Sequence, residues 1–358
     1  MKSDASATTT LAAILQDDVY PAYAYIVDQY GHEATANGMQ QNFTVNNVAP
    51  TVIGGDIDLN DGGNLILTVE AGETPSSTLD FTIRDANSCE NASSDPEIEG
   101  YTVVVYRDSY GTTTCDGTLG AYDPNYCYSS GVPTTTWNLS CTATSTCSGP
   151  TQDYVDYACT FPLWFVADPT DNGVNTPPAL ETDIWTAAVS GTDDNSASGP
   201  LVETDSPVDL DSFPVIGILS AEIVYGSIEP ASGMTNLTAT STAQNLGNTG
   251  IDQQVRGASM CGTYSISTPC APSATSTIPE DQQKFASTSL TYADVLAQTL
   301  SSTTWKIADL NIGQSQATST YNEEDTYWGI YVPGSITLAG SYTGMNSYLV
   351  EVSDPGNW

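Results

Sequence analysis

Basic side chains are almost absent from this chain, which carries 6 Lys and Arg against 43 Asp and Glu, a formal net charge of −37 at pH 7. A surface this negative repels phosphate backbones and anionic lipid head groups, so binding to nucleic acid or to a membrane surface is disfavoured. The same charge favours a divalent cation such as Ca²⁺ as a ligand. Adaptation of the host to high salt is a second explanation of the charge, and both explanations stay open at the level of the sequence.

Histidine is equally scarce. His32 is the only histidine and there is no pair of CxxC motifs, so a zinc site is not expected. A Ser-His-Asp centre would depend on His32 alone, and no glycine-rich phosphate loop occurs. The acids Glu323, Glu324 and Asp325 are adjacent on an extended stretch, where neighbouring side chains point to opposite faces, so they lack the facing arrangement that glycoside hydrolysis requires. We therefore expect that the protein is not an enzyme.

Long apolar runs are missing as well. None approaches the roughly 18 residues of a membrane span, and the best candidate, Val215–Tyr225, is interrupted by Glu222. Direct insertion into a membrane is therefore not expected. Near the N-terminus the longest apolar run is Leu11–Leu15, which is too short for the core of a signal peptide. We expect that a signal peptide has been removed or that the chain is a fragment of a longer secreted protein.

The residues that are abundant favour β-strands. Ser, Thr, Asn and Gly dominate the polar content and are accompanied by 20 Tyr, a mixture typical of half-buried strands. Within residues 43–69, Ala49-Pro50 interrupts an expected strand, because proline has no N–H to donate and restricts the residue before it. Short apolar runs follow, separated by the turn-forming cluster at 60–63. This stretch predicts a junction between two β-domains.

The junction divides the chain into three units. Residues 1–48 contain two expected strands, within 20–30 and 41–48, which are too few to close a sandwich. We interpret them as a partial β unit that belongs to an upstream domain, packs on another part of the same chain, or is completed by strand exchange with a neighbour. Residues 49–211 form a second unit with a Cys-rich insertion at 108–158, and residues 212–358 form a third. The apolar spacing in Thr291–Leu300 predicts one short helix.

Several stretches resemble a known class of proteins. FTVNNVAPTV at 43–52 and LDFTIRDANSC at 79–89 resemble the domain junctions of tandem immunoglobulin-like repeats in secreted bacterial and archaeal cell-surface proteins. The third unit is similar to envelope modules of the same kind in the segments 225–230, 242–250, 328–333 and 340–344. The resemblance implies an all-β fold, with two immunoglobulin-like β-sandwich domains in tandem preceded by the partial β unit.

The cysteines lie among polar turn residues rather than in apolar runs, and they are Cys89, Cys115, Cys127, Cys141, Cys147, Cys159, Cys261 and Cys270. An even number without a zinc motif predicts disulfides and an oxidising location, extracellular or at the cell surface. Nearness in the sequence favours the pairs Cys261–Cys270, Cys115–Cys127 and Cys141–Cys147. The resemblance implies the pair Cys89–Cys159, because Tyr157 precedes Cys159 by two residues as in the tyrosine corner of immunoglobulin domains.

Acidic and amide side chains gather where expected strands end. Asp85 with Asn87 follows one strand and Asp168 with Asp171 follows another, and similar clusters occur at 56–61 and 193–195. Loops at the end of a sandwich can supply the oxygen ligands that Ca²⁺ prefers, so Asp85, Asn87, Asp168 and Asp171 are candidate metal ligands and Ca²⁺ is the candidate cofactor. The competing interpretation is that these residues form Asx turns and solvated chain ends without a metal.

Four Asn-X-Ser/Thr sequons predict glycosylation in a host that modifies such sites, at Asn42, Asn91, Asn138 and Asn236. Exposed Tyr and Trp side chains can bind glycans, although pairing between strands explains them equally well. We expect a structural extracellular surface protein, a subunit of a filament, surface layer or stalk, whose partners are other copies of itself or neighbouring surface-protein domains. The alternative is an adhesin or carbohydrate-binding region of a larger secreted protein.

Overall fold

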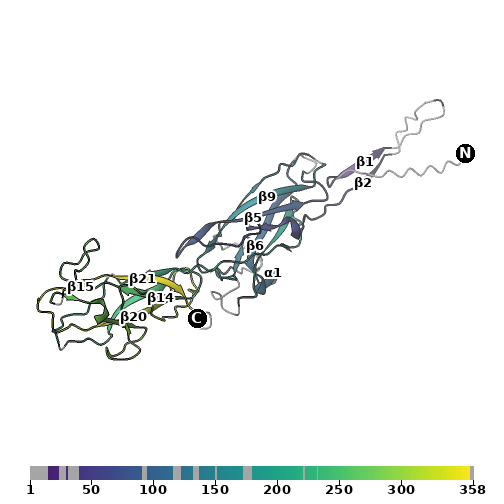
Figure 1. Cartoon of the computed structure of the whole chain (residues 1–358). Coiled ribbons are helices and arrows are strands. Elements are labelled where there is room, and N and C mark those ends of the chain that lie inside the picture. The colour runs from purple at the N-terminus through teal and green to yellow at the C-terminus, as the bar shows by residue number, and fades with distance from the viewer. Residues whose placement is uncertain are drawn as a thin grey trace.

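The computed structural model describes residues 15–23, 30, 40–90, 95–115, 122–131, 137–149, 151–171, 180–220, 222–231, 233–273 and 275–354. Within these ranges almost all regular structure is antiparallel β-sheet (Figure 1). The described helices are short: α1 (Gly111–Thr114) and four three-residue 3-10 turns at Gly54–Asp56, Asn60–Gly62, Asp108–Tyr110 and Glu280–Gln282. The prediction of an all-β sandwich fold is confirmed.

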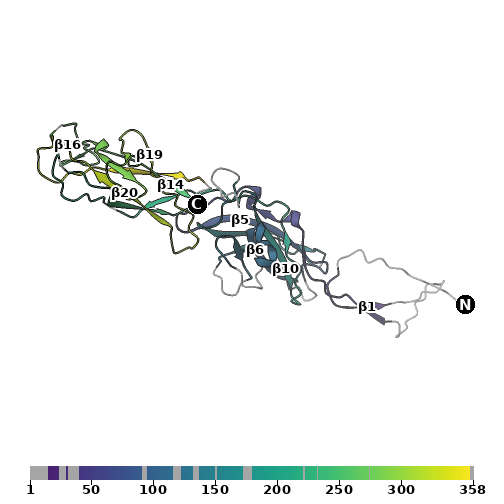
Figure 2. The same cartoon turned by 90° about the horizontal axis from the view of Figure 1, so that it is seen from below.

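The chain begins with a hairpin that stands apart from the sandwiches. Strand β1 (Val19–Tyr23) pairs antiparallel with β2 (Gln40–Thr44), and the rings of Tyr20 and Phe43 stack with centroids 5.5 Å apart. No third strand joins this sheet among the described residues. Figures 1 and 2 show the hairpin projecting from the end of the first sandwich that lies away from the second.

The first sandwich has two antiparallel sheets. One contains, in spatial order, β3 (Thr51–Val52), β5 (Glu73–Arg84), β9 (Tyr154–Trp164) and β8 (Ser140–Ala143), with β4 (Asp58–Leu59) also paired to β5. The other contains β11 (Val202–Glu203), β10 (Trp185–Asp193), β6 (Ile98–Arg107) and β7 (Cys127–Ser129).

Strand alternation places the core of this sandwich between the sheets. On β5, Leu79, Phe81 and Ile83 are 0–2% exposed, and they share one cluster with Val103 and Val105 of β6. Burying each aliphatic or aromatic side chain of this size contributes roughly 1.5–3 kcal/mol. The opposite face of β6 is covered too, because Val104 and Tyr106 pack against Cys115 and Cys127 of the Cys-rich insertion. The insertion therefore covers the outer face of one sheet.

The second sandwich repeats this plan with different strands. Its larger sheet contains β12 (Ile216–Ile218), β13 (Ala239–Asn245), β20 (Glu323–Ile330), β17 (Gln283–Ala286) and β18 (Gln298–Thr299). A smaller sheet contains β19 (Lys306–Ile307), β14 (Ile251–Gly257) and β21 (Asn346–Val352), and β15 (Met260–Cys261) pairs with β16 (Thr277–Ile278). Trp328 is fully buried among Phe285, Ile251 and Val255, and its indole N–H donates to the Ser241 hydroxyl at 2.8 Å.

The expected helix at Thr291–Leu300 is wrong. This stretch forms turns followed by β18, and Gln298 pairs with Phe285 of β17. Of the apolar residues that suggested a helix, Leu300 is buried but Val295 is 95% exposed, so they do not face one core. Lys284 further holds the segment in its turn conformation, because its ammonium group donates to the Tyr292 carbonyl at 3.0 Å.

Four disulfides join the eight cysteines, and two of the expected pairs are confirmed, Cys115–Cys127 and Cys261–Cys270. The other two expected pairs are wrong, because their partners are exchanged: the bridges are Cys89–Cys147 and Cys141–Cys159. Cys141 lies directly opposite Cys159 in the β8–β9 register, on the same sheet. Cys159 is therefore used within its sheet, which leaves Cys89 beyond the end of β5 to bond the loop that follows β8.

Candidate functional site

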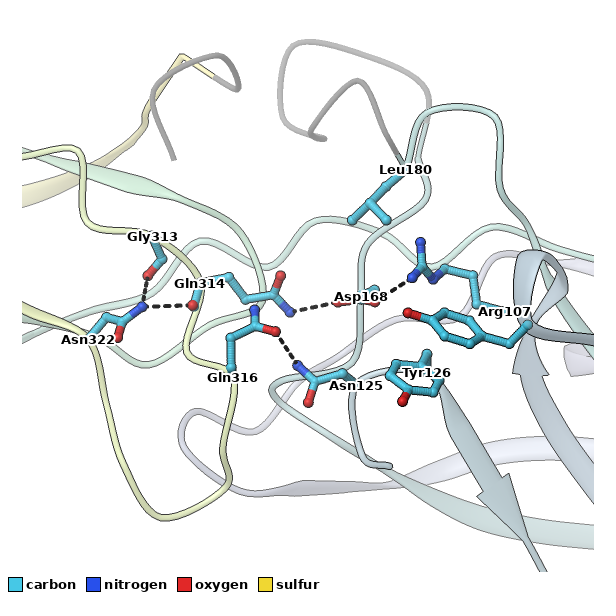
Figure 3. Close-up of a pocket in the computed structure, with 10 residues that line it drawn as sticks. Arg107, Asn125, Tyr126, Asp168, Leu180, Gly313, Gln314, Gln316 and Asn322 are labelled. Atoms are coloured by element: carbon cyan, nitrogen blue, oxygen red, sulfur yellow. Dashed lines mark hydrogen bonds and ion pairs between the residues drawn. The ribbon is translucent and has the colours of Figure 1, made fainter. Parts of the chain in front are cut away.

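The two sandwiches meet at a cleft of about 450 Å³ whose lining comes from both (Figure 3). The first sandwich contributes Arg107, the last residue of β6, and Asp168, which lies shortly after β9. The second contributes Gln314 and Gln316 from the segment before β20. These polar side chains face one another because the segments that carry them meet at the junction between the sandwiches (Figure 3).

Arg107 is the charged centre of this cleft and is only 7% exposed. Its guanidinium pairs with Asp168 at 3.2 Å and with Asp183 at 2.6 Å, and it lies 4.8 Å from the centroid of the Tyr110 ring. Tyr110 in turn stacks on Tyr126 with ring centroids 3.7 Å apart. Two carboxylates and an aromatic face thus compensate one buried cation, which is a structural arrangement.

Burial has the largest effect on the pKa of the Asp168 carboxyl. It raises the pKa of this carboxyl from its ordinary value of 3.8 to about 6, although Arg107 and a hydrogen bond from Gln314 act in the opposite direction. The Gln314 amide donates to Asp168 at 3.3 Å and to the Val166 carbonyl at 2.7 Å, so one side chain of the second sandwich binds two groups of the first.

Further hydrogen bonds cross the junction beside the cleft. The Asn248 amide donates to the carbonyls of Ala167 and Asp211 at 3.1 and 3.2 Å, and its oxygen accepts from the Phe213 N–H at 2.6 Å. Asn125 donates to Gln316 at 3.3 Å across the cleft (Figure 3). The polar side chains of the cleft are thus engaged with one another, and the arrangement holds the two sandwiches together.

A second site, an acidic cluster, lies at the opposite end of the first sandwich. It consists of Asp85 just after β5, Glu97 just before β6 and Asp193 at the end of β10, and the three are 0–1% exposed. One carboxylate oxygen from each residue lies within 4.8 Å of the corresponding oxygens of the other two. Adjacent strand ends of both sheets therefore bring three acids from separate parts of the chain to one buried point.

Hydrogen bonds satisfy only part of this cluster. Asp85 accepts from the Asn87 N–H at 2.7 Å through one oxygen. Asp193 accepts from the Ala197 N–H at 2.7 Å and from the Asn47 amide at 2.8 Å. The second oxygen of Asp85 and both oxygens of Glu97 are buried without a hydrogen-bond partner among the described residues.

The electrostatics of the cluster follow from this geometry. Burial is the main cause that raises the pKa of Glu97 to about 7 and that of Asp85 to about 6. The surrounding acids Asp17, Asp193 and Asp194 raise both values further. Each of these neighbours disfavours the ionised forms of Glu97 and Asp85.

The structure separates the four residues that the sequence suggested as Ca²⁺ ligands. Asp85 belongs to the acidic cluster, whereas Asn87 uses its oxygen to accept from the Val48 N–H at 2.7 Å. Asp168 is paired with Arg107, and Asp171 accepts from the N–H and hydroxyl of Ser212 at 2.9 and 2.7 Å. Calcium binding by Asp168 and Asp171 stays a prediction, and the carboxylate of Asp168 already has a cationic partner.

Sequence reasoning missed Glu97 altogether. The prediction treated the acids at 193–195 as a separate group, because no local sequence pattern connects positions 85, 97 and 193. One signal was available: Glu97 comes immediately before the apolar strand Ile98–Arg107, in which Ile98 and residues 103–107 are buried, and a charged residue beside such a strand needs a partner.

The predicted glycosylation sites that the structure describes are on the surface. Asn42, Asn138 and Asn236 are exposed, which is compatible with modification, whereas Asn91 lies outside the described residues, as does His32. Glycosylation of these residues stays a prediction.

The chain matches no model of a known protein family, and no curated protein sequence is significantly similar to it. No helix in the part of the chain that the structure describes is long and apolar enough to span a membrane.

Proposed function

We propose that the protein is a structural component of an extracellular surface, a subunit that assembles into a filament, surface layer or stalk. The observation that carries the proposal is the hairpin β1–β2, a two-stranded sheet at one end of an elongated pair of sandwiches (Figures 1 and 2). An isolated hairpin is marginally stable in water and presents open strand edges, so it gains most from pairing with another chain.

Disulfides support the extracellular part of this proposal. Four bridges use every cysteine of the chain. Such bridges persist in oxidising compartments and are rare in the cytosol. Three of the four lie in the first sandwich, where they tie down the loops of the Cys-rich insertion. A protein exposed outside the cell gains resistance to unfolding from this arrangement.

The two edges of the hairpin are not equivalent. The Val45 N–H donates to the Asp18 carbonyl at 2.9 Å, so in this antiparallel register residues 20 and 22 point their backbone groups toward β2. Pro21 therefore lies with its ring nitrogen on the outer edge of β1, where it removes a donor. The outer edge of β2 contains Thr44, which has an N–H, and is the better edge for pairing with a second chain.

The test is negative-stain electron microscopy of the full chain beside two variants. Thr44→Pro removes the outward N–H, whereas Thr44→Ala keeps it and serves as the matched control, since both variants also remove the sequon at Asn42. We expect filaments or sheets from the full chain and from Thr44→Ala, and dispersed particles from Thr44→Pro. Deletion of residues 1–50 should likewise abolish assembly. Dispersed particles in every sample would contradict the assembly proposal and favour an adhesin or carbohydrate-binding role instead.

A further inference from the structure

The acidic cluster contains more buried negative charge than its surroundings compensate. Asp85, Glu97 and Asp193 are each at most 1% exposed, and their closest oxygens lie within 4.8 Å of one another. Buried carboxylates are normally paired with a cation, because removing an ionised group from water is costly. A group of three without such a partner therefore needs an explanation.

No basic side chain in the described part of the chain supplies the compensation. Arg84 is adjacent to Asp85 in sequence, but its guanidinium pairs with Asp56 at 3.1 Å and lies 5.4 Å from the centroid of the Tyr154 ring. Arg107 is engaged at the junction, on the other side of the sandwich. The three remaining described basic residues belong to the second sandwich, and they are Arg256, Lys284 and Lys306.

Buried oxygen atoms without hydrogen-bond partners occur within the cluster and on the residue that donates to it. Besides the oxygens of Asp85 and Glu97, the side-chain oxygen of Asn47 is buried and lacks a hydrogen bond, while the nitrogen of the same amide donates to Asp193 at 2.8 Å. That bond places the neutral amide oxygen of Asn47 at the edge of the acidic cluster. Carboxylate and amide oxygens are the ligands of a hard cation.

We propose that Asp85, Glu97 and Asp193 bind a divalent cation of the Ca²⁺ type, with the Asn47 oxygen beside them. Ca²⁺ binds oxygen at about 2.3–2.6 Å, so two ligands on opposite sides of the ion are roughly 4.6–5.2 Å apart, which accommodates the separation in the cluster. The ligand set contains neither nitrogen nor sulfur, which disfavours zinc. Water supplies the remaining coordination positions.

The site connects the hairpin to the first sandwich. Asn47 lies three residues after the end of β2, and the next residue, Val48, donates its N–H to Asn87, which itself contacts Asp85 through its backbone. A cation that neutralises Asp85, Glu97 and Asp193 therefore stabilises the base of the hairpin against the sandwich. This inference concerns binding by the single chain and does not depend on whether the chain assembles.

Calorimetric titration with CaCl₂ after removal of metals by EDTA tests the proposal, in about 0.15 M NaCl to suppress diffuse binding to the acidic surface. The full chain should bind one tight equivalent of Ca²⁺ and unfold at a higher temperature when it is bound. Glu97→Gln should weaken this binding by more than about tenfold, because affinity depends on the number of charged ligands. The control Glu323→Gln, at an exposed acid of the second sandwich, should leave the titration unchanged.

A second readout separates a lost ligand from a damaged fold. Without Ca²⁺, Glu97→Gln should unfold at a higher temperature than the unmodified chain, since it removes one of three mutually repelling carboxylates. Asp85→Asn should behave in the same way. The amide of Val48 should exchange its hydrogen more slowly once Ca²⁺ is bound. Absence of a tight equivalent in the full chain, or identical titrations for the full chain and Glu97→Gln, would overturn the proposal.

Discussion

Two buried acids of the first sandwich differ in whether the protein supplies a partner for their charge. Asp168 is 7% exposed and lies 3.2 Å from Arg107, so its charge has a partner within the protein. Glu97 is 1% exposed, and its oxygens have no hydrogen bond from the described residues. The charge of Asp168 is compensated by Arg107, whereas no described residue compensates that of Glu97. We therefore propose a cation at the acidic cluster.

Asp168 also predicts a pH dependence of stability. Its pKa is raised in the folded state from 3.8 to about 6, so between these values the folded chain binds a proton that the unfolded chain does not. The free energy of unfolding should therefore gain up to about 3 kcal/mol from this group as the pH falls from 7 to 4. In urea unfolding, Asp168→Asn should reduce the gain on acidification. Asn322→Ala removes a polar but non-titrating group from the same cleft and should leave the gain on acidification unchanged. An unchanged gain in Asp168→Asn would refute the assignment of this gain to Asp168.

At the scale of elements, disulfides attach short segments of the Cys-rich insertion to the first sandwich. Cys141 and Cys159 join neighbouring strands at directly opposed positions, so this bridge secures the short strand β8 to the edge of its sheet. Cys89–Cys147 links the end of β5 to the loop after β8. The two bridges overlap in sequence, and together they fix the course of residues 137–149 across the sandwich.

Mapping of non-reduced peptides should therefore recover Cys89–Cys147 and Cys141–Cys159. Replacing Cys141 and Cys159 together by Ala should lower the free energy of unfolding by about 2–4 kcal/mol, because the unfolded chain loses a constraint. The matched control is the pair Cys261 and Cys270, whose removal should affect the second sandwich and leave unfolding of the first unchanged. Recovery of a Cys89–Cys159 peptide would contradict the register described for β8 and β9.

At the scale of the whole molecule, the two sandwiches lie end to end and are joined by more than a linker (Figures 1 and 2). Gly247 packs so closely on the connecting segment that a Cβ there would overlap the Phe213 carbonyl oxygen. Asn248 then bonds Ala167, Asp211 and Phe213. A turn of the second sandwich is thereby attached to the first, which favours a stiff rod over two independent domains.

Asn248→Ala should loosen this junction. It leaves two carbonyls and one N–H without the partner they have now, which should cost roughly 2–3 kcal/mol at the junction. In small-angle X-ray scattering, the variant should show a broader distribution of interatomic distances than the unmodified chain. Asn236→Ala, at an exposed position of the second sandwich, should scatter like the unmodified chain. Identical scattering of all three proteins would show that the linker alone sets the relative orientation of the two sandwiches.

Local sequence patterns were sufficient to predict the all-β fold. Alternation in a segment such as Leu79–Arg84 reflects the two-residue period of a strand, and this period is visible without any partner. The same reasoning failed at Thr291–Leu300, because a helical spacing of apolar residues means little when Val295 and Leu296 are exposed while Leu300 is buried. The short apolar run that follows the turn cluster at 60–63 forms no strand either, since Leu65 only bridges to Leu210.

The amino-acid sequence by itself determined the strands, the oxidised cysteines and the excess of negative charge, since each depends on composition or on neighbours in the chain. Tertiary structure alone decided how Cys89, Cys141, Cys147 and Cys159 pair and which acids meet. Cys141 bonds Cys159 because two strands lie in one register, and Glu97 joins Asp85 and Asp193 because three strand ends converge. Both outcomes depend on distances between residues far apart in the chain, which only the packing of the two sheets establishes.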